Sequence, residues 1–326
     1  MVRALAMISG GLDSILAAKL IKDQGIEVIG ICFKSYFFNE NSAIKMTKQI
    51  GIPLKVIDFS KEHLQMLKNP KHGYGKNMNP CIDCHAMMMN YSGKLLEEFD
   101  ADFIITGEVL NQRPMSQNKS ALDIVKKESG FKDKILRPLC AKNLKPTSIE
   151  LEGLVDREKL LNISGRSRKI QMELAEKWDI KDYPSSAGGC KLTEPNYSKR
   201  LRDLLSHREN EDPREIELLK YGRHFRVSDN AKIISTRTKE ECDDIKGLLR
   251  HDDYIFLAKD YKGSMVIIVG DPGMEDIEAA AKITARYSKG KDEKIVTVKY
   301  GKFNTPSNNS IQVEPPTEDY INSCII

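Results

Sequence analysis

The feature that most constrains the fold is an alternation of apolar strands and helical segments that runs from residue 3 to residue 107. RALAMI (residues 3–8) predicts a strand. A glycine turn follows, and DSILAAKLIKDQG (13–25) predicts a helix with Gly25 as its C-cap. Because strands alternating with helices of this length indicate βαβ units, we expect an α/β, Rossmann-like parallel sheet with helices on both faces.

Three more strands and two more helices continue this alternation. The strands are expected at 26–33, 54–59 and 101–107, and the helices at 41–51 and 86–99. Ligands bind at the carboxyl ends of the strands in such sheets. The loops after the first and fourth strands, together with the aperiodic loop 69–80 (NPKHGYGKNMNP), should therefore meet at one edge of the sheet.

The character of the chain changes after a charged stretch that begins near residue 198. From 228 onward, strand-like segments flank one helix, MEDIEAAAKITARYS (274–288), without βαβ alternation, which predicts a small α+β domain. Prolines and acidic residues near the end are typical of a flexible tail. The predicted organisation is a first domain over 1–205, a charged helical linker over 206–227, a second domain over 228–308 and a tail over 309–326.

Composition narrows the class of protein. No apolar run approaches the roughly 20 residues that span a bilayer, and the N-terminus lacks the apolar region of a signal peptide. We therefore expect a cytoplasmic protein without a membrane partner. Seven cysteines in such a chain favour thiol or metal chemistry over a disulfide framework. The net charge of +4 permits an RNA partner without requiring one.

The turn after the first strand, SGGLDS (residues 9–14), is a candidate phosphate site. Gly10 and Gly11 allow a tight turn whose amides face an anion, and the dipole of the following helix favours negative charge there. Asp13 would cap the helix or hold Mg²⁺ beside the phosphates. The string is neither a Walker A loop nor GxGxxG, since no lysine follows the glycines and the spacing differs.

SGGxDS resembles the pyrophosphate loop of the PP-loop ATPases (N-type ATP pyrophosphatases, of adenine nucleotide alpha hydrolase-like fold). Those enzymes cleave ATP between the α- and β-phosphates and adenylate a carbonyl oxygen. The resemblance covers about the first 200 residues, and it implies that adenine lies against Cys32 and Phe33. The other ATP-binding residues it implies in this stretch are Met7, Ile8, Ser9, Gly10, Gly11, Asp13 and Ser14.

TGEVLNQRPMSQ (106–117) is similar to a string of the 4-thiouridine synthases (ThiI), which introduce sulfur into tRNA, with one extra residue near Pro114. By this resemblance Gly107 approaches the nucleotide, while Gln112 and Gln117 line its pocket. RPLCAKNLKPTSIE (137–150) also resembles a segment of those synthases. The three strings agree in their order along the chain.

The cysteines offer a site for the sulfur. NPCIDCH (79–85) contains the pair Cys81 and Cys84, and AGGC (187–190) adds Cys190. Thiouridine enzymes resembling this chain use either a cysteine persulfide or a 4Fe–4S cluster held by three cysteines. The pattern here favours Cys81, Cys84 and Cys190 as cluster ligands. Persulfide chemistry ranks second, and a structural zinc that also uses His85 ranks third. A thioredoxin-like pair is weaker still, because the ATP loop occupies the place of that motif.

The C-terminal segment, roughly 228–305, resembles the NFACT-R (DUF814) domain, a module associated with tRNA and ribosomal RNA. Classical 4-thiouridine synthases grip tRNA with an N-terminal THUMP region, and this chain starts directly at the strand before the ATP loop. We therefore expect the C-terminal domain and the charged helix before it to contact RNA phosphates. The residues expected to do so are Lys199, Arg200, Arg202, Lys259 and Lys262.

These observations predict an ATP-dependent tRNA sulfurtransferase. Asp13, Cys81, Cys84 and Cys190 would be its catalytic residues, ATP, Mg²⁺ and a 4Fe–4S cluster its cofactors, and tRNA its partner. Sulfur would come from sulfide or from a cysteine desulfurase, and the sequence permits a homodimer. Two alternatives stay open: a redox-free PP-loop ligase that amidates a carbonyl, and an RNA-binding adaptor that has lost catalysis.

Overall fold

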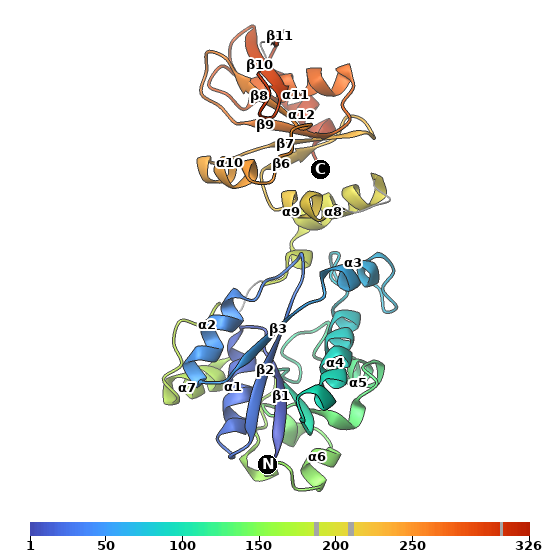
Figure 1. Ribbon diagram of the computed structural model, residues 1–326, viewed down its shortest axis with the longest axis vertical. Coiled ribbons are helices and arrows are strands. Elements are labelled where there is room, and N and C mark those ends of the chain that lie inside the picture. The colour runs from blue at the N-terminus through green and yellow to red at the C-terminus, as the bar shows by residue number, and fades with distance from the viewer. Residues whose placement is uncertain (186–188, 208–211, 307–308) are drawn as a thin grey trace. The chain divides into compact units, whose positions relative to one another are not determined.

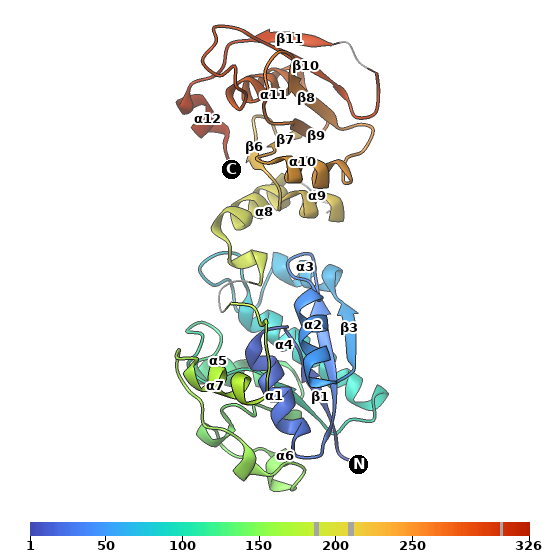
Figure 2. The same ribbon diagram turned by 90° about the vertical axis from the view of Figure 1, so that its left-hand side faces the viewer.

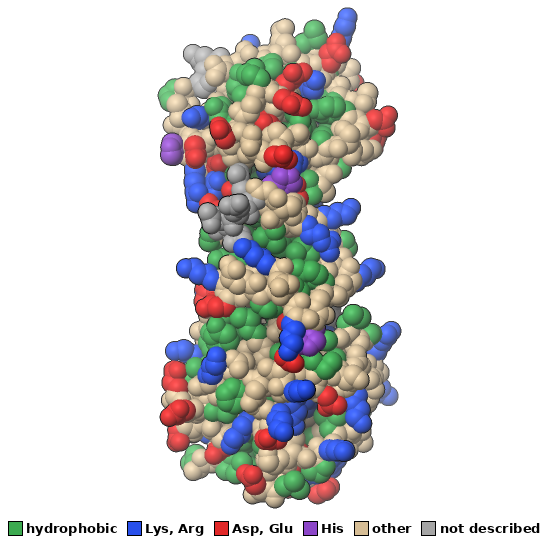
Figure 3. Space-filling model, turned by 90° about the vertical axis from the view of Figure 1, so that its right-hand side faces the viewer, with side chains coloured by type: hydrophobic (Ala, Val, Ile, Leu, Met, Phe, Trp, Pro, Cys, Tyr) green, Lys and Arg blue, Asp and Glu red, His purple; other side chains and the backbone are tan. Residues whose placement is uncertain are grey.

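The computed structural model describes residues 1–185, 189–207, 212–306 and 309–326. The chain divides into two compact units, Met1–Thr193 and Glu194–Ile326 (Figure 1, Figure 2). In the part of the chain that is described, no helix has both the length and the apolar character needed to cross a membrane. Figure 3 shows Lys and Arg side chains interspersed with Asp and Glu over the face that it displays.

The N-terminal unit is built on a five-stranded sheet in which every pair of strands is parallel, as the sequence predicts. Its order is β3 (Leu54–Asp58), β2 (Glu27–Lys34), β1 (Arg3–Met7), β4 (Phe103–Thr106) and β5 (Ile135–Leu136). After β1 the chain forms β2 and β3 on one side of this strand, and β4 then pairs with its other side. The carboxyl ends of β1 and β4 therefore mark the point at which the strand order reverses, which is where open α/β sheets bind ligands.

Helices cover both faces of this sheet (Figure 1). On one face lie α1 (Leu12–Lys22), α2 (Asn41–Ile50) and α7 (Lys169–Lys177). On the other lie α4 (Cys81–Glu98) and α5 (Lys119–Glu128). Two shorter helices, α3 (Ser60–Lys68) and α6 (Ser148–Leu151), complete the unit.

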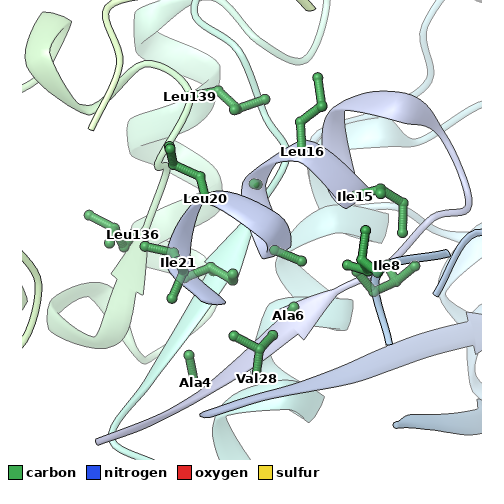
Figure 4. Close-up of a cluster of buried hydrophobic side chains, with 14 of the residues drawn as sticks. Ala4, Ala6, Ile8, Ile15, Leu16, Leu20, Ile21, Val28, Leu136 and Leu139 are labelled. Atoms are coloured by element: carbon green, nitrogen blue, oxygen red, sulfur yellow. The ribbon is translucent and has the colours of Figure 1, made fainter. Parts of the chain in front are cut away.

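The core explains why the first strand reads as a continuous apolar run. Ala4 and Ala6 of β1 lie beneath Ile15 and Ile21 of α1, as Figure 4 shows, while Leu5 belongs to the cluster under α4. A strand buried on both faces needs apolar residues at every position rather than at alternate ones. This packing fixes where β1 ends and hence where the glycine turn begins.

One helix begins earlier than the sequence predicts. The expected helix at 86–99 starts instead at Cys81, directly after Pro80 at its N-cap, with Asp83 in its first turn. Proline and an acidic residue are both favoured at the start of a helix. The CxxC pair therefore lies in the first turn of an 18-residue helix and not in the preceding loop.

The C-terminal unit is an α+β domain, as predicted. It begins with α8 (Pro195–His207) and α9 (Pro213–Leu218). An antiparallel sheet follows, in the order β11 (Ser310–Val313), β10 (Val296–Lys302), β8 (Tyr254–Ala258), β9 (Val266–Gly270), β7 (Ala231–Ser235) and β6 (Arg223–Phe225). One face of the sheet packs against α11 (Met274–Arg286). The other face packs against α10 (Lys239–Lys246).

Two boundaries differ from the predicted ones. The segment 206–227, expected to be a linker, contributes α9 and β6 to the C-terminal unit in its described part. The expected tail, 309–326, contains β11 and α12 (Glu318–Cys324), whose Ile321 and Cys324 lie in the core of that unit. The segment 206–227 is rich in charge, and in 309–326 the two consecutive prolines interrupt the apolar residues, so neither segment gave a clear periodic signal.

Candidate nucleotide and sulfur site

The turn between β1 and α1 has the geometry of an anion site. The Gly11 amide donates to Ser9 Oγ at 3.3 Å, and Ser14 Oγ donates to the Gly11 carbonyl at 2.8 Å. Gly11 is the N-cap of α1, and no side chain caps that helix end. The first amides of the helix are thus left to an external acceptor, and the helix dipole favours a negatively charged one.

Two glycines allow other segments to approach this turn closely. Gly10 has a φ of +78°, and a Cβ there would lie 2.6 Å from the Ala43 nitrogen at the start of α2. A Cβ on Gly107, just after β4, would collide with the backbone nitrogen of Ser14. The carboxyl ends of β1 and β4 therefore meet backbone to backbone, which only glycine permits.

Asp13 is held by a relay of two glutamines. Gln112 Nε2 donates to Asp13 Oδ2 at 2.7 Å, and Gln171 Nε2 donates to Gln112 Oε1 at 3.1 Å. The other carboxylate oxygen of Asp13, Oδ1, is buried without a hydrogen-bond partner among the described residues. Sequence reasoning named Asp13 and Gln112 but missed Gln171, which lies on α7 and has no exposed surface. The available signal was its spacing of three and four residues from Leu174 and Ala175, which places it on the apolar side of α7.

The other residues expected to bind ATP lie around this edge in different settings. Cys32 and Phe33 are both buried at the end of β2. They face opposite sides of the sheet, Cys32 in the cluster under α1 and Phe33 in the cluster under α4. Burial, and then the charge of Glu40, raises the pKa of Cys32 to about 12, so its thiol is neutral. Gln117 is buried, and its side-chain Oε1 has no hydrogen-bond partner in the described structure.

Two cysteines lie at the start of α4, and a third lies on a segment that is distant in the sequence. Cys81 and Cys84 are one turn apart on this helix, and Cys190 directly precedes the short 3-10 helix η4 (Lys191–Thr193). Burial raises the pKa of the Cys84 thiol well above its ordinary value, and the charges of Cys190 and Cys81 act in the same direction. Ala187 and Gly188, which precede this site in the sequence, lie outside the described residues.

The loop 69–80 connects the two halves of this cysteine group. Its His72 donates a backbone hydrogen bond to Asp83 at 2.9 Å, and its ring nitrogen Nδ1 lies 2.8 Å from the same carboxylate. Asn79 Nδ2 donates to Cys81 Sγ at 3.3 Å, and Asn77 Nδ2 donates to the Thr193 carbonyl at 2.7 Å. The loop is thus bonded both to the first turn of α4 and to the segment that carries Cys190.

Glu108 joins the cysteine helix to the nucleotide side of the sheet. Its carboxylate accepts from Arg137 Nε at 2.8 Å and lies 2.9 Å from His85 Nδ1. Burial opposes ionisation, but the Arg137 and His85 groups outweigh it and lower the pKa of Glu108 to about 2. His85 is thereby engaged away from the cysteines. The signal for Glu108 was its place in the string TGE, directly after a buried strand.

The donor atoms near the start of α4 suit a soft metal centre. Asp83 is bonded to His72 and His85 to Glu108, which leaves sulfur as the available donor type there. Thiolates are the usual ligands of iron–sulfur clusters. Among the described residues, however, no three His, Cys, Asp or Glu side chains already stand in the arrangement of a metal site.

The residues expected to contact RNA divide into two groups. Lys199 and Arg202 of α8 are exposed, as are Lys259 and Lys262 in the loop after β8. Arg200 is instead buried, and its guanidinium donates to the Leu219 carbonyl at 3.0 Å. We therefore correct the expectation for Arg200: this side chain holds α8 against the end of α9, and its donors are not presented to a phosphate.

Two protein families match separate parts of the chain. Residues 2–149 match the family described as Thiamine biosynthesis protein (ThiI). Residues 222–325 match the family described as NFACT protein RNA binding domain. Both resemblances that the sequence motifs indicated are thereby confirmed, one for each unit.

Curated relatives match part of the chain. The tRNA-specific 2-thiouridylase MnmA of Malacoplasma penetrans is 27% identical over 237 residues, which cover 63% of this chain and 60% of the relative. MnmA of Karelsulcia muelleri is 30% identical over 163 residues, covering 44% of this chain and 42% of the relative. The chain thus spans about 60% or less of the length of these relatives.

A solved structure, the U34-tRNA thiolase NcsA from Methanococcus maripaludis with its 4Fe–4S cluster, is 17% identical. The alignment covers 67% of this chain and 70% of that one, with a TM-score of 0.35. This score is too low to carry a structural argument.

Proposed function

We propose that this chain is an ATP-dependent transferase that replaces a carbonyl oxygen of a uridine in tRNA with sulfur. The observation that carries the proposal is that the loop 69–80 bonds both to Cys81, through Asn79, and to the Thr193 carbonyl, three residues after Cys190. Cys81 and Cys84 belong to α4, whose His85 is bonded to Glu108, next to the Gly107 backbone that approaches the glycine turn. A sulfur site and a phosphate site thus share one edge of the sheet.

The first half of the reaction needs the oxygen to become a leaving group. The glycine turn and the start of α1 would hold the ATP phosphates, and the buried, unpartnered Oδ1 of Asp13 fits a Mg²⁺ ion beside them. The uridine oxygen would attack the α-phosphate, and the bond to the β-phosphate would break with release of pyrophosphate. The product is an adenylated uridine, which can lose AMP.

The second half needs a sulfur nucleophile at the same carbon. Cys81, Cys84 and Cys190 would hold it, and a 4Fe–4S cluster on these three thiolates would leave one iron position for hydrosulfide. Attack of the sulfur on the ring carbon would expel AMP with the original oxygen. Asn79, which donates to Cys81 Sγ, would keep that sulfur oriented toward the cluster.

The test combines cluster assembly with sulfur transfer. Anaerobic reconstitution with iron and sulfide should give a brown protein whose iron and sulfide content matches one 4Fe–4S cluster. Cys84→Ala and Cys190→Ala should lose the colour and the transfer of sulfur to a tRNA transcript, measured by nucleoside mass spectrometry. Cys242→Ser, in the C-terminal unit, is the matched control and should keep both.

Other outcomes would favour the alternatives. Colourless protein with stoichiometric zinc would overturn the cluster. Full activity in the cysteine variants would support a redox-free ligase in which the thiols are structural. An absence of tRNA-dependent conversion of ATP to AMP, with Asp13→Asn indistinguishable from wild type, would support an RNA-binding adaptor.

A further inference from the structure

Two segments of the N-terminal unit contain no acidic residue. Residues 110–122 and 159–172 together have six positive side chains and neither Asp nor Glu: Arg113, Lys119, Lys159, Arg166, Arg168 and Lys169. The whole unit 1–193 has 29 Lys and Arg against 23 Asp and Glu, an excess of six, whereas 194–326 has 22 against 24. The net positive charge of the chain therefore lies in the N-terminal unit. The six positive side chains of the two segments equal the net charge of that unit.

The fold brings the two segments together beside the glycine turn. Leu110 and Ser164 form a parallel bridge, and the Gly165 amide donates to the Leu110 carbonyl at 2.8 Å. The glutamine relay connects the same two segments to Asp13. Residues about 50 positions apart in sequence therefore form one surface at the mouth of the nucleotide site.

The charged groups on this surface are available to a ligand. Arg113, Arg166 and Lys169 are exposed, and Arg168 is half-buried with its Nε atom lacking a hydrogen-bond partner in the described structure. Within the described ranges, the three arginines make no ion pair, and the carboxylate of Glu173 lies 3.9 Å from Lys169. Both lysines are thus paired, since Asp156 lies 3.5 Å from Lys159, and within the described structure the unpaired charges of this group are those of the arginines. Guanidinium groups without a protein partner match phosphate oxygens well.

The extent of this surface is limited on one side. A cavity of about 930 Å³ begins at Arg168 and Lys169 and continues along α7, but its far end is lined by Glu176, Asp179 and Asp182. Asp179 and Asp182 are paired with Lys181 and Lys45, and Glu176 adds a further negative charge, so this end offers a phosphate no excess of positive charge. The favourable direction for a polyanion therefore leads from Lys169 and Arg168 toward Arg113 and the glycine turn, not along the cavity.

We propose that Arg113, Arg166, Arg168 and Lys169 bind the phosphate backbone of the RNA substrate and hold the target nucleotide at the glycine turn. The choice of RNA rests on the proposed function. An extended surface with an excess of basic residues fits a polyanion, whereas the phosphates of one ATP molecule are already served by the turn and the start of α1. In this arrangement the N-terminal unit supplies most of the electrostatic attraction for RNA.

The experiment measures binding of an unmodified tRNA transcript by fluorescence anisotropy over a series of salt concentrations, without ATP. Arg166→Gln combined with Lys169→Gln should weaken binding at low salt about tenfold or more. It should also reduce the slope of log K against log salt by about 2, since each positive side chain removed leaves roughly one RNA phosphate without its partner. Arg113→Gln alone should reduce the slope by about 1. Affinity for an ATP analogue should not change.

Lys55→Gln combined with Lys61→Gln is the matched control. It removes the same charge from exposed positions of the same unit and should leave the slope within about half a unit of wild type. A wild-type slope in both test variants, equal losses in the control, or wild-type protein that does not bind tRNA would overturn the inference. So would a loss of ATP affinity as large as the loss for RNA, because the surface would then serve the nucleotide.

This test is separate from that of the proposed function, since it requires no catalysis. If the variants bind RNA more weakly than wild type but wild-type protein transfers no sulfur, the surface is supported and the thiolation chemistry is rejected. Sulfur transfer in a protein whose variants bind tRNA normally would retain the chemistry and reject the surface. Circular dichroism of each variant confirms that the exposed substitutions leave the fold intact.

Discussion

Gln171 is an uncharged residue that positions Gln112 and, through it, Asp13. It is fully buried on α7 and bonded to Gln112, which in turn fixes one carboxylate oxygen of Asp13. Because amides accept and donate in fixed directions, this relay sets the rotation of the Gln112 amide. It thereby leaves the second oxygen of Asp13, Oδ1, without a hydrogen-bond partner among the described residues.

Replacement of Gln171 by Leu should therefore weaken binding of an Mg·ATP analogue about five- to tenfold. Loss of one buried hydrogen bond costs about 1 kcal/mol, and the freed Gln112 amide can turn away from Asp13. Isothermal titration calorimetry measures the effect. Gln49→Leu makes the same chemical change at an exposed glutamine that bonds Lys181, and should bind as wild type. Equal affinities for both variants would show that the relay is not needed.

Lys232 is a buried cation in the C-terminal unit, 2.9 Å from Asp203 of α8. Burial lowers its pKa from 10.5 to about 8, although the charge of Asp203 acts in the opposite direction. The folded chain therefore releases this proton at lower pH than the unfolded chain does. Between about pH 8 and 10.5 the unfolded state binds more protons, so this residue makes the unfolding free energy rise with pH.

We expect Lys232→Met to remove that rise, by an amount on the order of 1–3 kcal/mol across the window. Denaturant unfolding of the C-terminal transition at the two ends of the window measures the difference between variant and wild type. Lys239→Met, at an exposed position on α10, is the control and should keep the wild-type pH dependence. A pH dependence in Lys232→Met that equals that of wild type would contradict the assignment.

Individual residues show where the sequence is informative. Tyr197, Leu201 and Leu204 are buried on α8, and Arg200 lies on the same side of the helix at three residues from Tyr197. Helical spacing therefore contained the information that Arg200 is buried. The positive charge of the segment pointed instead toward RNA. Bonds such as Gln171 to Gln112, in contrast, depend on how distant elements pack, and no local pattern predicts them.

Among the elements, α4 and the loop before it determine the environment of the cysteines. Pro80 starts the helix, so Cys81 and Cys84 lie in its first turn, where the helix dipole favours negative charge. Asp83, between the two cysteines, accepts both bonds from His72 and fastens the loop 69–80 onto the helix. One side chain thus joins a segment without regular structure to the first turn that carries the thiols.

Asp83→Asn should loosen this loop, because the amide cannot accept two charge-assisted bonds from His72. Trypsin should cleave after Lys71 and Lys76 several-fold faster than in wild type, as measured by mass spectrometry of timed digests. Asp123→Asn, at an exposed position on α5, should leave the cleavage rates unchanged. Equal rates in all three proteins would mean that other contacts hold the loop.

Four of the five strands of the parallel sheet and the helices α1, α2 and α4 could be predicted because their apolar residues recur with a clear period. The start of α4 could not, since NPCIDCH has no apolar repeat and its helix depends on proline and an acidic residue instead. The helices α3, α5, α6 and α7 and the strand β5 were also missed. β5 has only two residues, Ile135 and Leu136, which is too short for any periodic signal. The partnership of Cys190 with the CxxC pair came from a resemblance, and it stays a prediction.

At the scale of the whole molecule, each unit has its own apolar core. The division falls at Thr193 and Glu194, in a short connection before α8. Units with separate cores of this size generally fold alone.

We expect the fragments 1–193 and 194–326 to fold independently, each with the cooperative unfolding transition of a single domain. Calorimetry of the two fragments and of the full chain measures this. The full chain should show both transitions. A fragment without a cooperative transition would contradict the assignment, whereas a shift in one transition in the full chain would measure the coupling between the units.

The bonds that tie the cysteine site together have a consequence for the order of events during synthesis. Asn77 bonds to Thr193 across 116 positions, and Lys191 bonds to the Phe37 carbonyl across a still longer stretch. Such distant contacts form late. The chain must first close a long loop, which costs conformational entropy, before the contacts contribute any favourable free energy. On the ribosome, Cys81 and Cys84 emerge well before Cys190. The bonds from the loop 69–80 to the segment of Cys190 therefore have to wait until the last residues of the N-terminal unit have left the exit tunnel. The proposed three-cysteine site could be completed only after that point.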